Sequence, residues 1–392
     1  MRKDSLTPER QAFLVRCPDH PHVHALVAPP TPRRITGIER HFALLAKADN
    51  ALGQLEGVLQ GIPNRDLVTR TLARREAVQS SQIEGTRSDL PQLLLYEATL
   101  GADGLPADVK ITERYVQALQ SGLDTIHAQG RAALNLALVN RLHAMLMQDA
   151  PEGFPRGRYR PGQVWIGAGR IEDATFVPAP AAHLDGSMRE FEQGILQYRP
   201  REDEQTELSM ISQLAIAHAQ FETIHPYQDG NGRTGRLLMP LLLASEGYPS
   251  LYLSGILLRQ KQAYYDALAG VQLRGDWGTW IQLLAKAVIA ACEDSIAIAQ
   301  DLSAIQNAWE QQVGKFRADS VLRRLPAFLI GHPVVSVRQI SEDLGVSIPV
   351  ANQSVASLKK LGILEDVDTT RKWGRAFRAR QVLERLDRPA PV

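Results

Sequence analysis

Between Ile35 and Met147, apolar residues recur mostly at intervals of three and four, which is the pattern of amphipathic helices. These intervals predict four helices, over residues 35–59, 66–83, 112–127 and 134–147. Gly85 follows the second of them, at the position where a residue in the left-handed conformation often ends a helix. Residues 1–35 are rich in proline and histidine and show little periodicity, so they are expected to form an irregular arm.

The pattern changes between Pro151 and Pro180, where glycine and proline are frequent. Two short strand-like runs lie in this segment, QVWIG at 163–167 and ATFVP at 174–178. They predict a small β-hairpin among loops. Helical periodicity returns at Met188 and continues to about residue 302.

Another pattern begins near Arg317. The run VSVRQISEDLGVSIPVANQSVASLKKLGILEDV predicts a helix, a tight turn at Gly345, a second helix and a strand. Ser347 is expected to cap the second helix, and Pro349 is tolerated in its first turn. The following TRKWGRAFRAR resembles a β-hairpin wing, so residues 317–392 are predicted to form a winged-helix domain. This region carries 13 Lys and Arg against 8 Asp and Glu, an excess of 13 − 8 = +5, which leaves DNA binding and protein binding both open.

Composition narrows the class of protein. The chain has 392 residues, enough for two or three domains, and a formal net charge of +1, which argues against bulk attraction to nucleic acid or to a membrane. Its two cysteines, Cys17 and Cys292, favour a reducing compartment without a disulfide framework or a zinc cluster. The start MRKDSLTPER lacks the apolar segment of a signal peptide, and no run of about 18 apolar residues occurs. We therefore expect a cytoplasmic protein without a membrane segment.

A group of histidines near the start could suggest a metal site. His20, His22 and His24 follow Cys17 and Asp19, but this spacing matches no established ligand pattern. A solvated loop is the expected structure of this stretch.

The run HPYQDGNGRTGR, residues 225–236, contains the pattern G-x-G-x-x-G of dinucleotide-binding proteins. That fingerprint requires a buried strand before it and a helix after it within a βαβ unit. Here residues 208–224 have mostly helical spacing, and a second helix is expected to run to Gly247. The predicted unit is helix, loop, helix, and this excludes a dinucleotide site of the usual kind.

The residue types in this run favour phosphoryl or nucleotidyl transfer. Successive small residues at 230–232 allow backbone N–H groups to converge on an anion at the start of a helix. Arg233 and Arg236 lie three residues apart on that helix and suit a polyphosphate. Asp229 could hold Mg²⁺, and His225 could act as a base near neutral pH. Tyr227 is expected to anchor the loop in the core.

The whole run is similar to the signature of the Fic family, H-x-F-x-D/E-G-N-G-R-x-x-R, with Tyr227 in place of the usual phenylalanine. The resemblance implies AMPylation, in which AMP passes from ATP to a hydroxyl side chain of a target protein. It also implies that His225 is the general base and that Asp229 binds Mg²⁺. The ATP-binding residues that it implies in this loop are Gly230, Asn231, Gly232, Arg233, Thr234, Gly235 and Arg236.

The resemblance extends from about residue 35 to 300. The run QVWIG is similar to the flap that holds the backbone of the target as an added strand, which implies a target-binding role for Val164, Trp165, Ile166 and Gly167. The run RQKQAYYDAL is similar to the segment whose tyrosines line the adenine pocket, here Tyr264 and Tyr265.

SSQIEG, residues 80–85, matches the inhibitory motif S/T-x-x-x-E-G/N of the same family, with Ser80, Glu84 and Gly85 at its defining positions. The resemblance implies that Glu84 pairs with Arg236 and obstructs productive placement of the ATP γ-phosphate. The alternative is that Glu84 is a solvated residue in the last turn of its helix.

These observations predict a mainly α protein, a Fic-type helical core with a small β-hairpin flap and a C-terminal winged-helix domain. The expected domains are an N-terminal helical region with the inhibitory helix at about 66–85, a catalytic core, a helical linker and the winged helix; they span 1–105, 106–302, 303–316 and 317–392. The expected function is ATP- and Mg²⁺-dependent transfer of AMP to a Ser, Thr or Tyr hydroxyl of a target protein, with the chain itself among the candidate targets. Removal of AMP by the same site and nucleotide-sensing regulation through DNA binding are the alternatives, and a homodimer is among the oligomeric states left open.

Overall fold

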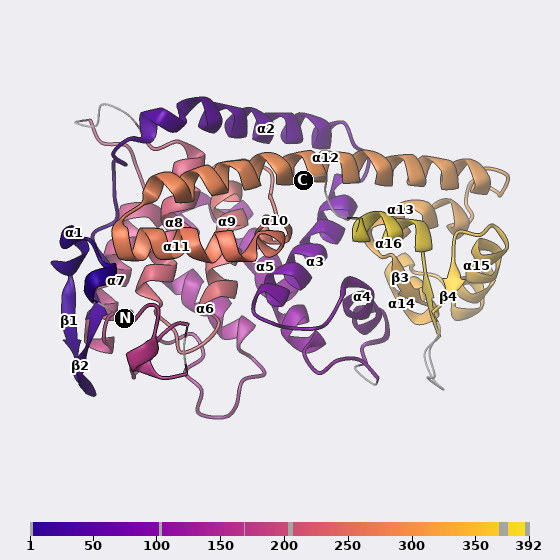
Figure 1. Cartoon of the computed structure of the whole chain (residues 1–392). Coiled ribbons are helices and arrows are strands. Elements are labelled where there is room, and N and C mark those ends of the chain that lie inside the picture. The colour runs from indigo at the N-terminus through magenta and orange to yellow at the C-terminus, as the bar shows by residue number, and fades with distance from the viewer. Residues whose placement is uncertain (1–2, 102–103, 168, 203–206, 368–374, 389–392) are drawn as a thin grey trace. The chain divides into compact units, whose positions relative to one another are not determined.

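The structure is a computed structural model that describes residues 3–101, 104–167, 169–202, 207–367 and 375–388 (Figure 1). Its chain divides into two compact units. The first comprises residues 1–53 and 117–289, and the second comprises residues 54–116 and 290–392. Helices α2 (Phe42–Gln60), α5 (Val109–Gln129) and α12 (Trp277–Val313) contain residues of both.

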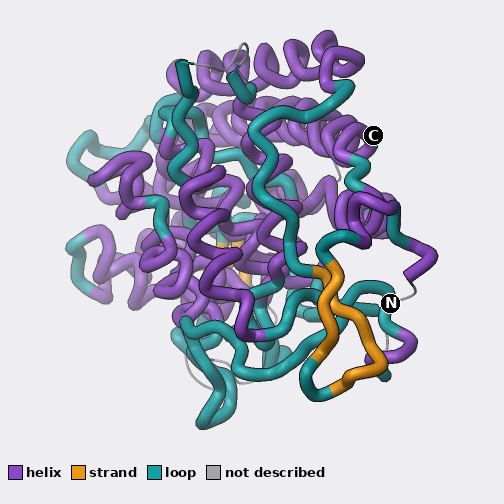
Figure 2. Tube along the Cα trace, turned by 90° about the vertical axis from the view of Figure 1, so that its left-hand side faces the viewer, coloured by secondary structure: helices purple, strands orange, loops and turns teal. Residues whose placement is uncertain are grey.

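Near its N-terminus the first unit contains a β-hairpin where an irregular arm was expected. Strand β1 (Leu14–Cys17) pairs antiparallel with β2 (His20–Leu26), and the two form the orange hairpin of Figure 2. Leu14 lies opposite Leu26 in this pairing. Val23 and Ala25 of β2 are buried, whereas the three histidines occupy the alternate positions, as the period of a strand requires. The prediction of a solvated loop is therefore wrong, because two buried alternate positions hold this segment as a strand.

This hairpin is continuous with the hairpin expected near residue 170. Leu26 forms a parallel bridge with Pro178, and Ile166 forms an antiparallel bridge with Phe176. One hydrophobic cluster joins the two parts, since Cys17 and Val23 pack with Ile171, Ala174 and Val177.

The remainder of the first unit is helical. Its α-helices are α1 (Pro8–Gln11), α6 (Leu136–Leu146), α7 (Leu184–Phe191), α8 (Met210–Ile224), α9 (Asn231–Ser245), α10 (Ser254–Arg259) and α11 (Lys261–Arg274). Shorter 3-10 helices cover Lys3–Ser5, Ile38–His41, Gly130–Ala133, Ile171–Asp173 and Ala181–His183, and Glu192–Leu196 forms a π-helix. Helix α8 is central: all its residues except Gln213 are buried, and α7, α9 and α11 pack against it. The core of this unit therefore surrounds the helix that ends at the predicted site.

The second unit combines helices with a small sheet. Its α-helices are α3 (Arg65–Ile83), α4 (Leu90–Thr99), α13 (Leu325–Gly331), α14 (Val337–Leu344), α15 (Ile348–Lys360) and α16 (Arg380–Asp387), and Val321–Arg323 is a 3-10 helix. Strands β3 (Val334–Ser336), β4 (Glu365–Asp366) and β5 (Ala376–Arg378) form an antiparallel sheet in the order β3-β5-β4. The predicted helix, turn and helix are α14, a left-handed Gly345 with φ of 65°, and α15.

The N-cap of α15 and the wing are two features of the expected winged helix. Ser347 does occupy the N-cap position of α15, but its side chain makes no capping hydrogen bond, so that part of the prediction is wrong. The turn of the predicted wing, residues 368–374, lies outside the described residues.

Segments from the two ends of the chain share the core of the second unit. Leu94, Leu95 and Ala98 of α4 pack with Val334 of β3 and Ala376 of β5. Helix α3 packs on α13, where the hydroxyl of Thr71 donates a 2.7 Å hydrogen bond to the carbonyl of Ile330. The contact is close, since a Cβ at Gly331 would lie 2.7 Å from a methyl group of Leu67. Helix α3, which carries the predicted inhibitory motif, thus packs on the C-terminal helix α13.

None of the helices in the described part of the chain is long and apolar enough to span a bilayer.

Candidate active site

The run HPYQDGNGRTGR spans the loop between α8 and α9 and the first turns of α9, so the predicted helix-loop-helix is confirmed. His225 closes α8 in the left-handed conformation, with φ of 50°, and Gly230 precedes α9 with φ of 81°. Left-handed backbone is unfavourable for a residue with a Cβ, so the surroundings must hold His225 in place.

Glu222 lies behind His225, one turn earlier on α8. Its Oε2 is 3.7 Å from Nδ1 of His225, and its side chain is buried. Burial raises the pKa of the Glu222 carboxyl, whereas His225, His218 and Arg236 lower it. The lowering is the larger effect, so the net shift of this pKa is downward. An ionised carboxylate at this position favours a proton on Nδ1 and leaves Nε2 of His225 as the acceptor.

Asp229 is the exposed carboxylate of the loop, with 67% of its side chain accessible. One oxygen accepts a 2.6 Å hydrogen bond from the N–H of Gly230, and the other lies 3.8 Å from the Arg233 guanidinium. The described residues contain no group of three or more His, Cys, Asp and Glu side chains that could enclose a metal. A single accessible carboxylate fits Mg²⁺ that takes its other ligands from water and phosphate oxygens.

The first turn of α9 presents backbone N–H groups at the positive end of the helix dipole. The side chain of Asn231 is engaged within the loop, accepting from the N–H of Tyr227 at 2.9 Å and donating to its carbonyl at 2.8 Å. The hydroxyl of Thr234 donates to the carbonyl of Gly230 at 2.8 Å. These two side chains stabilise the loop, and the backbone N–H groups at the start of α9 are suited to an anion.

The two signature arginines are both buried, Arg233 at 7% and Arg236 at 1% exposure. They come from the first two turns of α9 and are three residues apart. Arg233 also contacts the sulfur of Met147 at 3.6 Å. Two guanidiniums beside a helix N-terminus are the kind of donors that suit a polyphosphate.

Tyr264 and Tyr265 of α11 occupy different surroundings. Tyr264 is buried, and its hydroxyl lies 2.7 Å from Nε2 of His218, in an aromatic cluster that includes Trp280. Tyr265 is 40% exposed, with its ring centroid 5.2 Å from that of Tyr264. Contact of both with adenine remains a prediction, and Tyr265 is the one with an accessible ring.

The expected flap is a short hairpin. The N–H of Ile166 donates to the carbonyl of Phe176, and the N–H of Thr175 donates to the carbonyl of Ile166, both at 2.9 Å. Gly167 has φ of 90°, and a Cβ there would lie 2.3 Å from the Thr175 hydroxyl. Trp165 packs against the cluster of the N-terminal hairpin, and Val164 is partly buried. The target-binding role of these residues remains a prediction.

The predicted inhibitory motif lies at the end of α3, as expected. Ser80 is buried, Glu84 is exposed at the C-cap, and Gly85 follows with φ of 97°. Glu84 belongs to the second unit and Arg236 to the first, and their pairing remains a prediction.

His143 of α6 is a site residue that was not anticipated. Its ring stacks on Tyr227 at 3.6 Å with an angle of 4° between the planes. Nδ1 accepts a 2.9 Å hydrogen bond from the N–H of Gly157, so Nε2 carries the proton that is donated to the carbonyl of Asp229 at 3.0 Å. Burial lowers the pKa of His143 to about 4, and the ring is neutral at physiological pH.

Tyr227 is itself buried, and its hydroxyl donates a 2.6 Å hydrogen bond to the side-chain oxygen of Asn140, which confirms its expected anchoring role.

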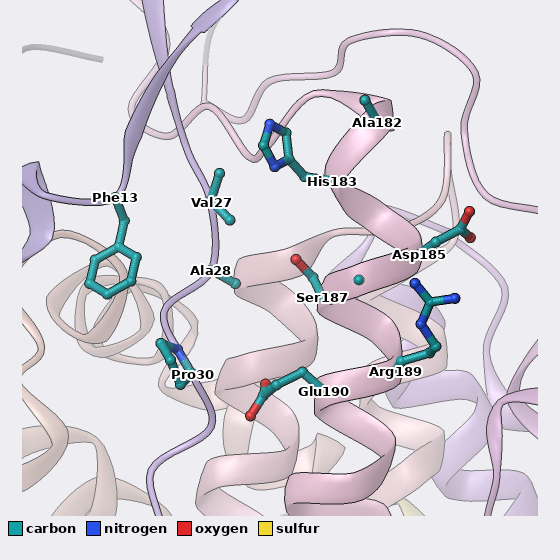
Figure 3. A pocket seen from close by; sticks show the side chains of 11 residues that line it. Phe13, Val27, Ala28, Pro30, Ala182, His183, Asp185, Ser187, Arg189 and Glu190 are labelled. Atoms are coloured by element: carbon teal, nitrogen blue, oxygen red, sulfur yellow. The ribbon is translucent and has the colours of Figure 1, made fainter.

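A separate hollow of about 580 Å³ lies between the N-terminal segment and α7 (Figure 3). Phe13, Val27 and Pro30 line one side, and Ser187 and Glu190 project from α7. None of its lining residues belongs to the loop between α8 and α9. It is therefore a different surface of the first unit.

Comparison with known families identifies the class of protein that carries this helix-loop-helix site. Residues 42–124 match the Fic/DOC family N-terminal model, and residues 133–243 match the Fic/DOC family model. The chain belongs to the Fic/DOC family.

Individual relatives agree with this assignment. A protein adenylyltransferase Fic of Aedes aegypti is 25% identical over 287 residues, which are 68% of this chain and 52% of the relative. The chain thus spans about half the length of that curated relative. Among solved structures, a Fic family protein from Desulfovibrio desulfuricans superposes with a TM-score of 0.53 at 19% identity, over 90% of this chain and 98% of that one. A Fic domain containing signaling protein from Bacteroides thetaiotaomicron gives 0.52 at 18% identity, over 65% and 98%. These likenesses confirm the mainly α, Fic-type fold.

Proposed function

We propose that this chain is a protein adenylyltransferase that transfers AMP from ATP to a Ser, Thr or Tyr hydroxyl of a target protein. The observation that carries the proposal is one loop that combines a base, His225, an accessible carboxylate, Asp229, and an anion-binding helix start with Arg233 and Arg236. Two relatives of this chain are named protein adenylyltransferase Fic, and this supports the same reaction.

In this reaction the hydroxyl oxygen of the target forms a bond to the α-phosphorus of ATP, and the bond from that phosphorus to the bridging oxygen breaks to release pyrophosphate. His225 takes the hydroxyl proton on Nε2, with Glu222 behind Nδ1 to favour that tautomer and to stabilise the imidazolium that forms. Arg233, Arg236 and the first N–H groups of α9 offset the charge that develops on pyrophosphate. Mg²⁺ held by Asp229 would supply further positive charge at the phosphates.

We also propose that Glu84 inhibits this reaction by pairing with Arg236 and taking the place of the γ-phosphate. Support comes from the motif SSQIEG and from the exposed position of Glu84 at the C-cap of α3. A carboxylate beside a buried guanidinium competes directly with an anionic phosphate for the same donors.

The experiment is incubation of wild type, Glu84→Gly and the double variant Glu84→Gly/His225→Ala with ATP labelled on the α-phosphate and a cell lysate. We expect little labelling by wild type, strong labelling by Glu84→Gly, and none by the double variant. Loss of label from a purified AMPylated target in the presence of wild type, but not of Glu84→Gly, would instead support removal of AMP by the same site.

A DNA-binding role has one structural feature in its favour. The order β3-β5-β4 with α13, α14 and α15 is compatible with a winged helix, and α15 exposes Asn352, Gln353, Lys359 and Lys360. A mobility-shift assay on genomic fragments, with Asn352→Ala/Gln353→Ala as the control, tests this second function.

A further inference from the structure

Arg160 is a buried cation in the segment that leads into the flap. Only 2% of the residue is exposed, whereas Arg156 and Arg158 of the same segment are exposed. Burial of an arginine is costly unless its donors are satisfied, so its partners indicate why it is there.

The guanidinium donates to three backbone carbonyls. Nε donates to His225 at 2.9 Å, one terminal nitrogen to Gly162 at 3.0 Å, and the other to Ala179 at 2.5 Å. The backbone N–H of Arg160 also donates to the carbonyl of Pro226 at 2.9 Å. One side chain therefore joins the residue that carries the base to positions on either side of residues 163–178.

Gly162 and Ala179 flank the two runs that form the flap. Gly162 immediately precedes QVWIG, and Ala179 immediately follows ATFVP. The two runs meet through the bridge between Ile166 and Phe176. Fixing both ends of this hairpin to the His225 carbonyl fixes the flap relative to the base, because His225 is also held in a left-handed conformation.

The hydrogen bonds of the Arg160 side chain indicate that it joins backbone segments and does not neutralise a carboxylate. Within the described residues, Arg160 forms no ion pair with a carboxylate; every hydrogen bond of its guanidinium goes to a carbonyl. Burial lowers the pKa of Arg160 to about 10, so it remains charged at neutral pH. A planar fork with fixed donor directions can serve three diverging acceptors, whereas a lysine ammonium on a flexible stem cannot hold the same three positions.

We propose that Arg160 is a positioning residue that sets the distance between a target segment held on the flap and Nε2 of His225. This inference rests on the proposed function, and it assigns Arg160 to alignment of the acceptor hydroxyl rather than to nucleotide binding. Its loss should lower the turnover of a protein target and leave the affinity for ATP nearly unchanged.

The test compares Arg160→Lys with Arg158→Lys, a matched control on an exposed residue two positions away, both in the Glu84→Gly background. We expect Arg160→Lys to lower kcat for a protein target by about 10²-fold, the size expected when a reacting group is misplaced by about 1 Å. KM for ATP should stay within the range of the control. Arg160→Ala should recover part of the lost rate on addition of methylguanidinium, which a general loss of packing would not allow.

A second readout does not depend on AMP transfer. Hydrogen exchange at the N–H groups of Ile166 and Thr175 reports opening of the flap, and both should exchange faster in Arg160→Lys than in Arg158→Lys. If the parent transfers no AMP but this difference is seen, the proposed function fails while the anchoring of the flap by Arg160 stands. If Arg160→Lys fails to fold, Arg160→Gln is compared in the same two assays. Equal kcat and equal exchange in the Arg160 and Arg158 variants would overturn the inference.

Discussion

The Nε2 of His143 lies 3.0 Å from the carbonyl oxygen of Asp229, so a buried neutral imidazole holds the backbone of the proposed metal-binding residue. The other ring nitrogen accepts from Gly157, and the ring face covers Tyr227. His143 thereby joins α6, the segment leading to the flap, and the signature loop. These hydrogen bonds and this stacking contact hold the signature loop in place, and this makes His143 a support of the site.

Replacing His143 by phenylalanine should keep the stacking on Tyr227 and remove both hydrogen bonds. A buried polar group left without a partner costs about 1–3 kcal/mol. We expect the free energy of unfolding to fall by an amount in that range and AMP transfer to fall with it. Urea denaturation measures the first and label incorporation the second. His127→Phe, on an exposed helical histidine, is the control. Equal unfolding free energies and equal AMP transfer in the two variants would show that His143 does not support the site.

The same imidazole predicts a dependence of stability on pH. Its pKa is lowered to about 4 in the folded chain, from about 6.5 in an unfolded one. Between these values the unfolded chain binds more protons, so stability from the neutral ring is present above pH 6.5 and is lost as the pH falls toward 4. The loss is up to about 3 kcal/mol. The difference in unfolding free energy between wild type and His143→Phe should shrink over this interval; a difference independent of pH contradicts a neutral buried ring.

Glu222 should matter for the chemical step. In Glu222→Gln the carboxylate that favours the proton on Nδ1 of His225 is lost while the shape is kept. Since a well-placed general base contributes about 10²–10⁴ in rate, we expect kcat to fall by about 10-fold or more without a loss of ATP affinity. Steady-state AMP transfer and nucleotide titration measure the two quantities. Glu207→Gln, at an exposed position of the first unit, serves as the control. A Glu222→Gln variant as fast as that control would remove Glu222 from the mechanism.

The contact between α3 and α13 should contribute to the stability of the second unit. Gly331→Ala would bring a Cβ to within 2.7 Å of Leu67, and overpacking of this kind costs about 1–3 kcal/mol. Gly57→Ala on α2 meets nothing within 4 Å and should raise stability by about 1 kcal/mol. Thermal unfolding of the two variants should therefore move in opposite directions, and a Gly331→Ala variant as stable as wild type would show that the contact is loose.

Asp229→Asn tests the proposed metal ligand. The amide keeps the size of the side chain but removes the charge that Mg²⁺ requires. We expect AMP transfer to need a much higher Mg²⁺ concentration, with folding unaffected because 67% of the side chain is exposed. Titration of the rate against Mg²⁺ gives the shift. An unchanged Mg²⁺ dependence would mean that Asp229 binds no metal.

Much of the helical fold could be predicted because its periodicity is local. The expected helix over 66–83 is α3, Arg65–Ile83, and the left-handed Gly85 after it is confirmed. Helix α4 was missed although Asp89 and Gln92 form a capping box that the sequence already contains. The N-terminal strand was missed because Pro21 and three histidines hide two buried positions in a polar-looking run.

The supporting residues of the site could not be predicted in the same way. The signature loop is contiguous in the sequence, so its helix-loop-helix setting followed from local patterns. His143 and Arg160 act on backbone carbonyls 86 and 65 residues away, and backbone acceptors carry no sequence pattern. Their roles depend on tertiary contacts that only the fold provides.

The most direct measurement of the central claim is transfer of AMP by Glu84→Gly with His225 intact or replaced by alanine. Purified protein is incubated with ATP labelled on the α-phosphate, Mg²⁺ and lysate, and nucleotide binding is checked in parallel by titration. We predict that Glu84→Gly labels at least one protein, and that Glu84→Gly/His225→Ala binds ATP normally but labels none. Equal labelling by the two variants would contradict the assignment of this site to AMP transfer.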